Sequence, residues 1–329
     1  MKTLFLLLFT SILFIKVSGQ EAAYDFQELK LNKTMASPTQ EFSGLYIFKD
    51  NLYLLPENDI KNISGLFIMK VSDLEKQAAD KNRVAKTRSL KFSNLDLMIK
   101  KINQRNQGYD GLEALTVTDK EIYFSVETVE DTCYLIKGSI KESTIVMDTK
   151  FLIGLLKPKR QNGARTCNAG FEGMEFSGSN LLCFFEFNDL YTASVAVVNI
   201  LNGETSWKPL ARLAFRLTDV TWTANNKLTA INYFYAGGGC DTIYQPEKHS
   251  ADYRLATDNE YKFKNLCRLI ELEQTETGFN WNPVFNFPAP YHLFNWEGIA
   301  AYKESYFLIN DRYTGGEQGS HLYLLRPKK

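Results

Sequence analysis

The stretch Gly170–Glu186 (GFEGMEFSGSNLLCFFE) decides the fold, because its pattern recurs along the chain. The pattern begins with an aromatic or apolar residue, an acid, a glycine and a second apolar residue. A turn and a strand that ends in an acid come next, and a further strand follows. Units of four short antiparallel strands that repeat at uneven spacing are typical of β-propeller blades. The sequence therefore predicts an all-β fold, a β-propeller.

Five copies of the pattern are recognisable, which predicts five blades. The copies begin at Phe42, Tyr109, Phe171, Leu217 and Trp296. A sixth, degenerate blade is an alternative, and so is a β-sandwich with coincidental similarity, although the shared internal order argues against a sandwich. The last copy stops after three strands, and an open sheet edge invites aggregation. We therefore expect Ala22–Leu31 to supply the fourth strand and close the ring.

The N-terminus, Met1–Gly19, has the features of a secretory signal peptide. Lys2 precedes the apolar run Leu4–Ile15, and this run of about 12 residues is shorter than the ~20 that a spanning helix needs. No other stretch is long enough to span a bilayer. We expect residues 20–329 to form one domain, secreted to the extracellular space or the periplasm.

Composition excludes some classes of protein. Basic and acidic residues balance at 38 each, so the charge pattern of a nucleic-acid-binding protein is absent. Hydrophobic residues make up 44% of the chain, enough for a large core. We expect the protein to be a monomer. Helical periodicity is convincing only at Asn94–Gln107, where we expect an amphipathic helix.

Five cysteines occur in the chain, and in an oxidising compartment some should pair. Cys240 and Cys267 bracket one polar insertion, and Cys167 and Cys183 flank a turn, so these are the two pairs we predict. The odd count leaves at least one free thiol, with Cys133 outside both pairs.

The repeat brings acids together. In an antiparallel hairpin, the start of the first strand and the end of the second lie at the same end. We expect the first strands to line the central channel, so that one group of acids rings its mouth: Asp110, Glu172, Asp219 and Glu297. A second group should lie beside them: Glu57, Glu127, Glu186 and Asp311.

Crowded carboxylates repel one another, and three outcomes relieve this repulsion. Some keep a proton, some pair with an arginine, or a hard cation such as Ca²⁺ binds among them, since Ca²⁺ takes six to eight oxygen ligands. The candidate arginine partners are Arg165, Arg216 and Arg312. A wholly structural role, in which the acids accept backbone N–H groups, and direct acid–base catalysis are the alternatives to a metal site.

Few other motifs indicate chemistry. The G-x-S-x-G pattern of serine hydrolases is absent. His292 precedes Glu297 in an aromatic stretch, where a packed histidine is expected over a general base. The four tryptophans, Trp207, Trp222, Trp281 and Trp296, would suit either a sugar-binding surface or the blade cores.

The blade motifs resemble those of the secreted phytase-like propeller family, the domain described as having esterase-like activity of phytase. The resemblance covers nearly the whole chain after the signal peptide. It rests on four blade variants in family order: Phe42–Leu45 with Leu52–Asn58, Gly170–Met174 with Leu181–Glu186, Leu217–Trp222 with Asn226–Ile231, and Asn295–Ala300 with Leu308–Arg312. One departure is Asn232-Tyr233-Phe234, which stands where the family's fourth blade carries an acid followed by arginines.

The resemblance implies a secreted propeller with an acid-lined channel, calcium, and hydrolysis of phosphate or other esters. On this basis we expect metal-assisted hydrolysis of a phosphoester, with Arg312 holding the phosphate and Glu297 as the second catalytic candidate. The alternative is a non-catalytic binding or scaffolding propeller whose channel carboxylates are structural.

Overall fold

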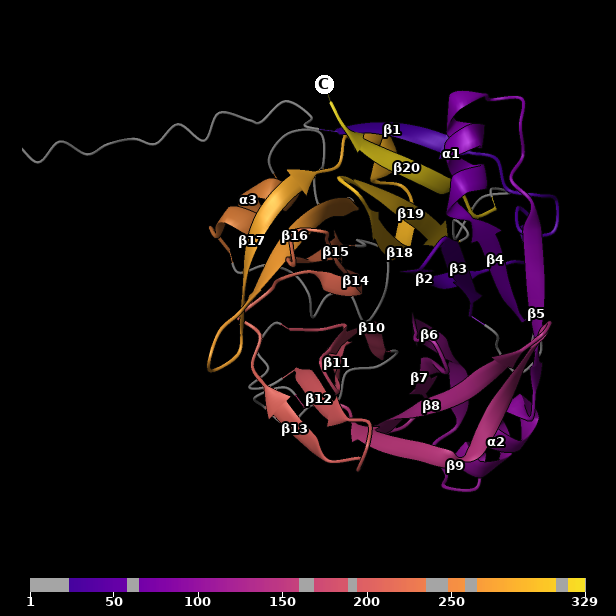
Figure 1. The fold of residues 1–329 in the computed structure, drawn as a ribbon. Helices are drawn as coiled ribbons and strands as arrows, with labels where there is room; N and C mark the ends of the chain where they lie inside the picture. The colour runs from indigo at the N-terminus through magenta and orange to yellow at the C-terminus, as the bar shows by residue number, and fades with distance from the viewer. Residues whose placement is uncertain are drawn as a thin grey trace, which may run out of the picture.

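A computed structural model describes residues 24–57, 65–159, 169–188, 194–234, 248–257, 265–311 and 319–328, and most of them lie in β-strands. The strands are arranged radially around a central axis (Figure 1). The prediction of an all-β propeller is confirmed. The expected signal peptide, Met1–Gly19, lies outside the described residues.

The described strands form five antiparallel units of four, and each unit begins at one of the sequence repeats. The first consists of β2 (Phe42–Phe48), β3 (Asn51–Pro56), β4 (Leu66–Lys70) and β5 (Thr87–Ser93). The second consists of β6 (Tyr109–Val117), β7 (Ile122–Thr128), β8 (Thr132–Lys141) and β9 (Thr144–Leu156). A short parallel pairing of β5 with β9 joins these two blades into one eight-stranded sheet.

The remaining three blades are separate four-stranded sheets. Blade three consists of β10 (Phe171–Ser177), β11 (Asn180–Phe185), β12 (Val195–Asn199) and β13 (Thr205–Lys208). Blade four consists of β14 (Arg216–Trp222), β15 (Leu228–Phe234), β16 (Leu266–Gln274) and β17 (Phe279–Asn286). Blade five contains β18 (Asn295–Tyr302), β19 (Ser305–Asp311) and β20 (Leu322–Pro327).

The N-terminal strand β1 (Tyr24–Leu29) completes blade five. It pairs antiparallel with β20, from Tyr24 opposite Pro327 to Leu29 opposite Leu322. The aromatic ring of Phe26 stacks on that of Tyr291 with centroids 3.8 Å apart. The expectation that Ala22–Leu31 closes the ring is confirmed for Tyr24–Leu29, and Ala22 and Ala23 lie outside the described residues.

The first strand of every blade lies next to the axis. These strands, β2, β6, β10, β14 and β18, each contact the next around the ring, and β18 contacts β2. They approach closely: a Cβ on Gly298 would lie 3.0 Å from the backbone nitrogen of Leu45 on the neighbouring strand. Apolar side chains fill the space between adjacent blades, as Leu45 and Leu54 of blade one do against Phe307 of blade five.

A β-bulge interrupts all five inner strands at the same place. In each, the register with the second strand shifts after the first residue of the repeat, so one extra residue is inserted. The inserted residues are Ser43, Asp110, Glu172, Thr218 and Glu297. The bulge therefore aims one side chain per blade away from the regular pleat, at the end of the ring where the hairpins' second strands finish.

Helices lie outside the ring of strands (Figure 1). The expected helix forms as α2 (Leu95–Asn103), shorter at both ends than the predicted Asn94–Gln107. A second helix, α1 (Val71–Ala79), was not expected. Two short elements, α3 (Ala251–Thr257) and the 3₁₀ turn η3 (Ala289–Tyr291), complete the described set. Within the described ranges, none of the helices has the length and apolar character to cross a membrane.

The two predicted disulfides are wrong. Cys183 and Cys267 are free, as is Cys133, and all three are buried. Cys183 packs in the core between blades two and three, and Cys267 packs in the core between blades four and five. Cys167 and Cys240 lie outside the described residues.

Removing β1 should open the ring. A chain that begins at Lys30 loses the pairing with β20 and the burial of Leu29 and Phe26, so we expect a loss of roughly 3 kcal/mol or more in unfolding free energy, since each buried side chain is worth ~1.5–3 kcal/mol. Thermal melting measures the loss. A chain that begins at Tyr24 keeps β1 and is the control; equal melting temperatures for the two chains would contradict closure by β1.

Candidate functional site

A cavity of about 190 Å³ opens at the end of the axis where the bulges lie. Its lining carries eight carboxylates and one guanidinium: Phe42, Ser43, Glu57, Asp110, Glu113, Glu127, Glu172, Glu186, Arg216, Asn295, Glu297 and Asp311. We call this cavity the acidic mouth. It brings together seven of the eight acids predicted from the sequence and adds Glu113.

The bulges divide the five inserted residues into two kinds. The hydroxyls of Ser43 and Thr218 each donate to a backbone carbonyl of a neighbouring inner strand at 2.6 Å, and so link adjacent blades. The other three inserted residues are acids of the mouth. Glu172 and Glu297 are buried, with 7% and 9% exposure, whereas Asp110 is exposed.

Three carboxylates lie closest together. One oxygen from each of Glu113, Glu127 and Glu172 lies within 4.8 Å of the other two, and all three side chains are buried. Glu113 and Glu127 belong to blade two and Glu172 to blade three. We call this group the glutamate trio.

Glu113 reaches the trio because of a second register shift in β6, between Leu112 and Leu115. The Ser125 hydroxyl accepts the N–H of Ala114 at 2.8 Å and donates to the carbonyl of Phe171 at 2.7 Å, which supports the irregular backbone. A Cβ on Gly111 would lie 2.8 Å from Oε1 of Glu113, so the glycine leaves room for this side chain. The sequence signal was available: the second repeat has three extra residues between its glycine and its terminal acid.

Two described cations contact the acids of the mouth. Arg216, one of the three predicted arginine partners, places Nη1 3.1 Å from Oε1 of Glu186. Lys157 lies with Nζ 3.6 Å from Oε1 of Glu127 and donates to the carbonyl of Thr128 at 2.6 Å. Arg165 and Arg312 lie outside the described residues.

Burial and mutual repulsion raise the pKa values of five of the mouth carboxyls. Burial, then the neighbouring Glu41 and Asp311, raises the pKa of Glu57 to about 8. Burial raises the pKa of Glu127 to about 7, although Lys157 opposes the shift.

The same causes act more strongly on the deeper acids. Burial, followed by the charge of Glu127, raises the pKa of Glu113 well above its ordinary value. The pKa of Glu172 and that of Glu297 are also raised mainly by burial, with Arg216 opposing the shift of Glu297. Burial and crowding therefore favour the protonated, neutral form of these carboxyls.

Asp219 is the exception among the predicted mouth acids, because it does not line the mouth. Its carboxylate accepts the backbone N–H groups of Val220 and Ile299 at 2.8 Å and of Leu45 at 3.4 Å. These bonds link the inner strands of blades four, five and one.

The physical reason is a difference of one residue. In the fourth repeat Thr218 occupies the bulge and Asp219 occupies the position that is glycine in the other blades. On the far side of the bulge, the side chain of Asp219 points to the neighbouring strands instead of the mouth. Asp219 is therefore a structural residue and leaves the set of candidate metal ligands.

Blade four also differs at Asn232, the position at which the sequence departs from the phytase-like pattern. Its amide donates to the carbonyl of Arg216 at 2.9 Å and accepts from Nε of Arg268 at 2.7 Å. Arg268 in turn pairs with Asp252 of α3 at 2.7 Å. A neutral, hydrogen-bonded amide thus replaces an acid on this side.

His292 is a packed histidine, as expected. It is 4% exposed, its Nε2 lies 2.5 Å from the carbonyl of Phe287, and burial lowers its pKa. It does not line the acidic mouth.

Comparison with known proteins gives little beyond the fold. No protein-family model matches the chain, and no match was found among the curated proteins. Among solved structures, the chain is similar to the native arabinanase of Bacillus subtilis, with 12% identity over 88% of this chain and 95% of that one, and a TM-score of 0.49.

Two further solved structures have similarly low sequence identity to this chain and similar coverage of it. Virginiamycin B lyase from Staphylococcus aureus is 9% identical over 92% of this chain and 99% of that one, with a TM-score of 0.39. The allergen Mala s 1 of Malassezia sympodialis is 10% identical over 92% of this chain and 96% of that one, with a TM-score of 0.42.

The raised pKa values predict how stability depends on pH. A carboxyl whose pKa is raised in the folded state binds more protons there than in the unfolded state, so stability falls as pH rises through the gap between the two values. For Glu127 and Glu57 the gap runs from the ordinary 4.5 to about 7 and about 8. We expect the chelator-treated protein to lose stability steadily across this range, as measured by urea unfolding.

The variant Glu127→Gln should flatten this pH dependence, because its neutral side chain cannot ionise. The matched control is Glu276→Gln, at an exposed position outside the mouth. Stability that rises with pH over the same range would show that the mouth acids are ionised in the folded protein.

Proposed function

We propose that the acidic mouth binds a divalent cation, with Ca²⁺ as the ion, and that the loaded site hydrolyses a phosphoester or another ester. The observation that carries the proposal is the glutamate trio, in which three buried carboxylates from two blades lie within 4.8 Å of one another.

The donor chemistry supports a hard cation. All the ionisable side chains of the lining other than Arg216 are carboxylates, and oxygen ligands are those that Ca²⁺ prefers. Zinc favours histidine and cysteine, and neither contributes to the lining. Oε1 of Glu127 is buried and accepts no hydrogen bond among the described residues; its one described partner is Lys157, with Nζ 3.6 Å away, so a closer bond to a cation would satisfy this oxygen.

The trio would hold the ion, and Glu57 and Glu297 line the same cavity beside it. A bound divalent cation neutralises phosphate charge and lowers the pKa of a coordinated water. Burial raises the pKa of Glu297, which favours a role as the proton donor to a leaving group. Arg216 is the described guanidinium at the mouth and is oriented by Glu186.

The charge of the mouth makes this activity dependent on the cation. With eight carboxyl groups and one arginine in the lining, the empty mouth offers an anionic substrate little positive charge. Arg312, expected from the sequence to hold the phosphate, lies outside the described residues. We further propose that the protein is secreted, on the basis of Met1–Gly19, and extracellular modules typically bind Ca²⁺ with Kd values of about 10⁻⁴–10⁻³ M.

Calcium should raise the melting temperature of the chelator-treated protein. At a hundredfold excess over Kd, binding to the folded state alone adds about 2.7 kcal/mol of stability. In Glu113→Gln we expect the calcium-induced shift to disappear, while Glu276→Gln should keep it. Differential scanning calorimetry measures both. No shift in the unmodified protein would support the alternative of purely structural carboxylates.

Turnover is tested separately with phytate, p-nitrophenyl phosphate and p-nitrophenyl acetate. We expect hydrolysis of at least one of them with calcium, none with chelator, and at least about a tenfold loss of rate in Glu113→Gln, equivalent to 1.36 kcal/mol. Calcium-induced stabilisation without any turnover would contradict the hydrolytic part of the proposal and leave a cation-binding propeller.

A further inference from the structure

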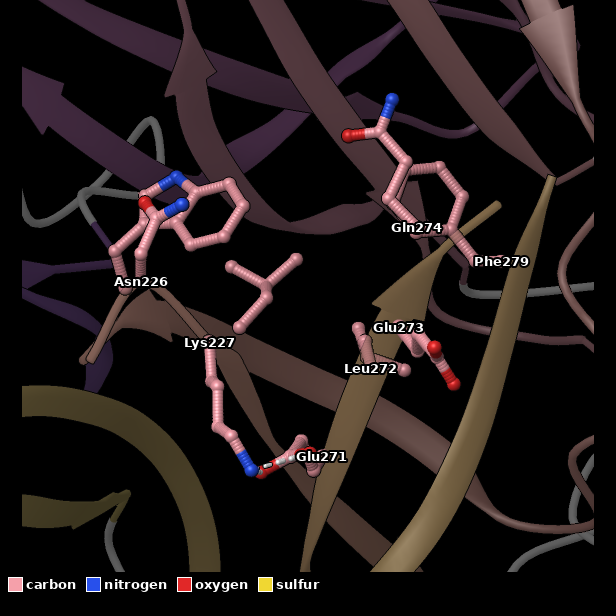
Figure 2. A pocket seen from close by; sticks show the side chains of 9 residues that line it. Asn226, Lys227, Glu271, Leu272, Glu273, Gln274 and Phe279 are labelled. Carbon is pink, nitrogen blue, oxygen red and sulfur yellow. Dashed lines mark hydrogen bonds and ion pairs between the residues drawn. The ribbon is translucent and has the colours of Figure 1, made fainter. Parts of the chain in front are cut away.

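A second and larger cavity, of about 510 Å³, lies at the opposite end of blade four from the acidic mouth. The strand β14 begins at the mouth with Arg216 and ends at this cavity with Trp222. Figure 2 shows the side chains that line it: Trp222, Asn226, Lys227, Leu228, Glu271, Leu272, Glu273, Gln274 and Phe279. We call it the distal pocket.

The distal pocket has an apolar floor. Leu228, Leu272 and Phe279 are each 3% exposed or less and belong to the core between blades three and four. Trp222 is half-buried and packs against the same core. These side chains offer a fixed apolar surface to a ligand.

The indole of Trp222 is held in place from blade three. Its Nε1 donates to the carbonyl of Phe176 at 2.8 Å, and its backbone N–H donates to the buried carboxylate of Glu175 at 3.1 Å. The polar edge of the indole is therefore already satisfied, so that a ligand meets the ring itself.

The rim of the pocket is polar and largely uncommitted. Asn226, Glu273 and Gln274 are exposed, and no hydrogen bond of their side chains is present within the described ranges. In Figure 2 the amides of Asn226 and Gln274 stand on opposite sides of the pocket. Asn226 adopts a left-handed backbone with φ of 56° in the turn between β14 and β15, which places it at the rim.

The charges at the rim disfavour an anion. Lys227, the one cation of the lining, pairs with Glu271 at 2.9 Å (Figure 2). Glu273 adds a negative charge with no cation beside it in the lining. A phosphate or sulfate would therefore gain no free positive partner.

From these features we propose that the distal pocket binds the end of a neutral oligosaccharide. A pyranose ring has an apolar C–H face that suits the indole and the leucine floor. Its hydroxyls both donate and accept, so they suit the amides, which do the same, and the carboxylate, which accepts. The volume lies within the ~300–1,000 Å³ of typical small-molecule sites. The site is separate from the acidic mouth and does not depend on its activity.

The test is titration of the intact protein with cellotriose, maltotriose and mannotriose, followed by calorimetry and saturation-transfer NMR. We expect at least one to bind with a Kd of about millimolar strength, equivalent to ~4 kcal/mol. Gln274→Ala and Asn226→Gly should each weaken this binding by about fivefold, the effect of one hydrogen bond. Glycine is chosen at position 226 because it tolerates the positive φ.

Two controls make the result specific. Glu276→Ala changes an exposed residue just outside the lining and should leave binding unchanged, and so should Glu113→Gln at the acidic mouth. The proposal would be overturned if none of the three sugars bound. It would also be overturned if the two rim variants bound the sugar as tightly as the unmodified protein does. Tighter binding of glucose 6-phosphate than of the neutral sugars would also overturn it, because the rim offers no free cation.

Discussion

The bulge in each inner strand is the constraint on which the rest of the structure depends. Five strands converge on one axis, where a Cβ on Gly298 would already collide with the next strand. In blades two, three and five the inserted residue is the acid before the glycine, and the bulge lets this acid line the mouth. Together with Glu113 and the acids near the ends of the second strands, these three residues bring eight carboxyl groups to a cavity of about 190 Å³.

Buried acids in this molecule differ in whether backbone N–H groups surround them, and this difference decides their role. Asp219 accepts three backbone N–H groups, which oppose the rise in its pKa caused by burial but do not cancel it. Glu113 and Glu172 have no comparable set of backbone donors among the described residues. Their pKa values are raised by burial and then by the charges of nearby carboxylates. The hydrogen bonds of Asp219 stabilise the ring. Glu113 and Glu172 lack such donors, and a bound cation can supply positive charge to them.

Much of the fold could be predicted from the sequence, because each repeat has a recognisable order of apolar, acidic and glycine residues. The blade order, the hairpins and the closing strand β1 follow from this order. The bulges could not, since a one-residue shift leaves no mark in the hydrophobic pattern. This is why Asp219 was wrongly placed at the mouth, although Thr218 is the bulge residue of blade four, and why Glu113 was missed inside an insertion. The disulfide prediction failed because sequence spacing does not show that Cys183 and Cys267 point into separate cores. Helix α1 was missed although Val71, Leu74 and Ala78 recur at helical spacing.

The parallel contact between β5 and β9 makes blades one and two a single continuous sheet, so hydrogen bonds run unbroken across that boundary. At the boundary between blades two and three, by contrast, the described strands share no ladder and the contact is made by side chains. The glutamate trio spans this second boundary, with two members on one side and one on the other. An ion held there would bind both blades and link them across a boundary that no strand pairing crosses. Separation of the two blades and release of the ion would then be coupled.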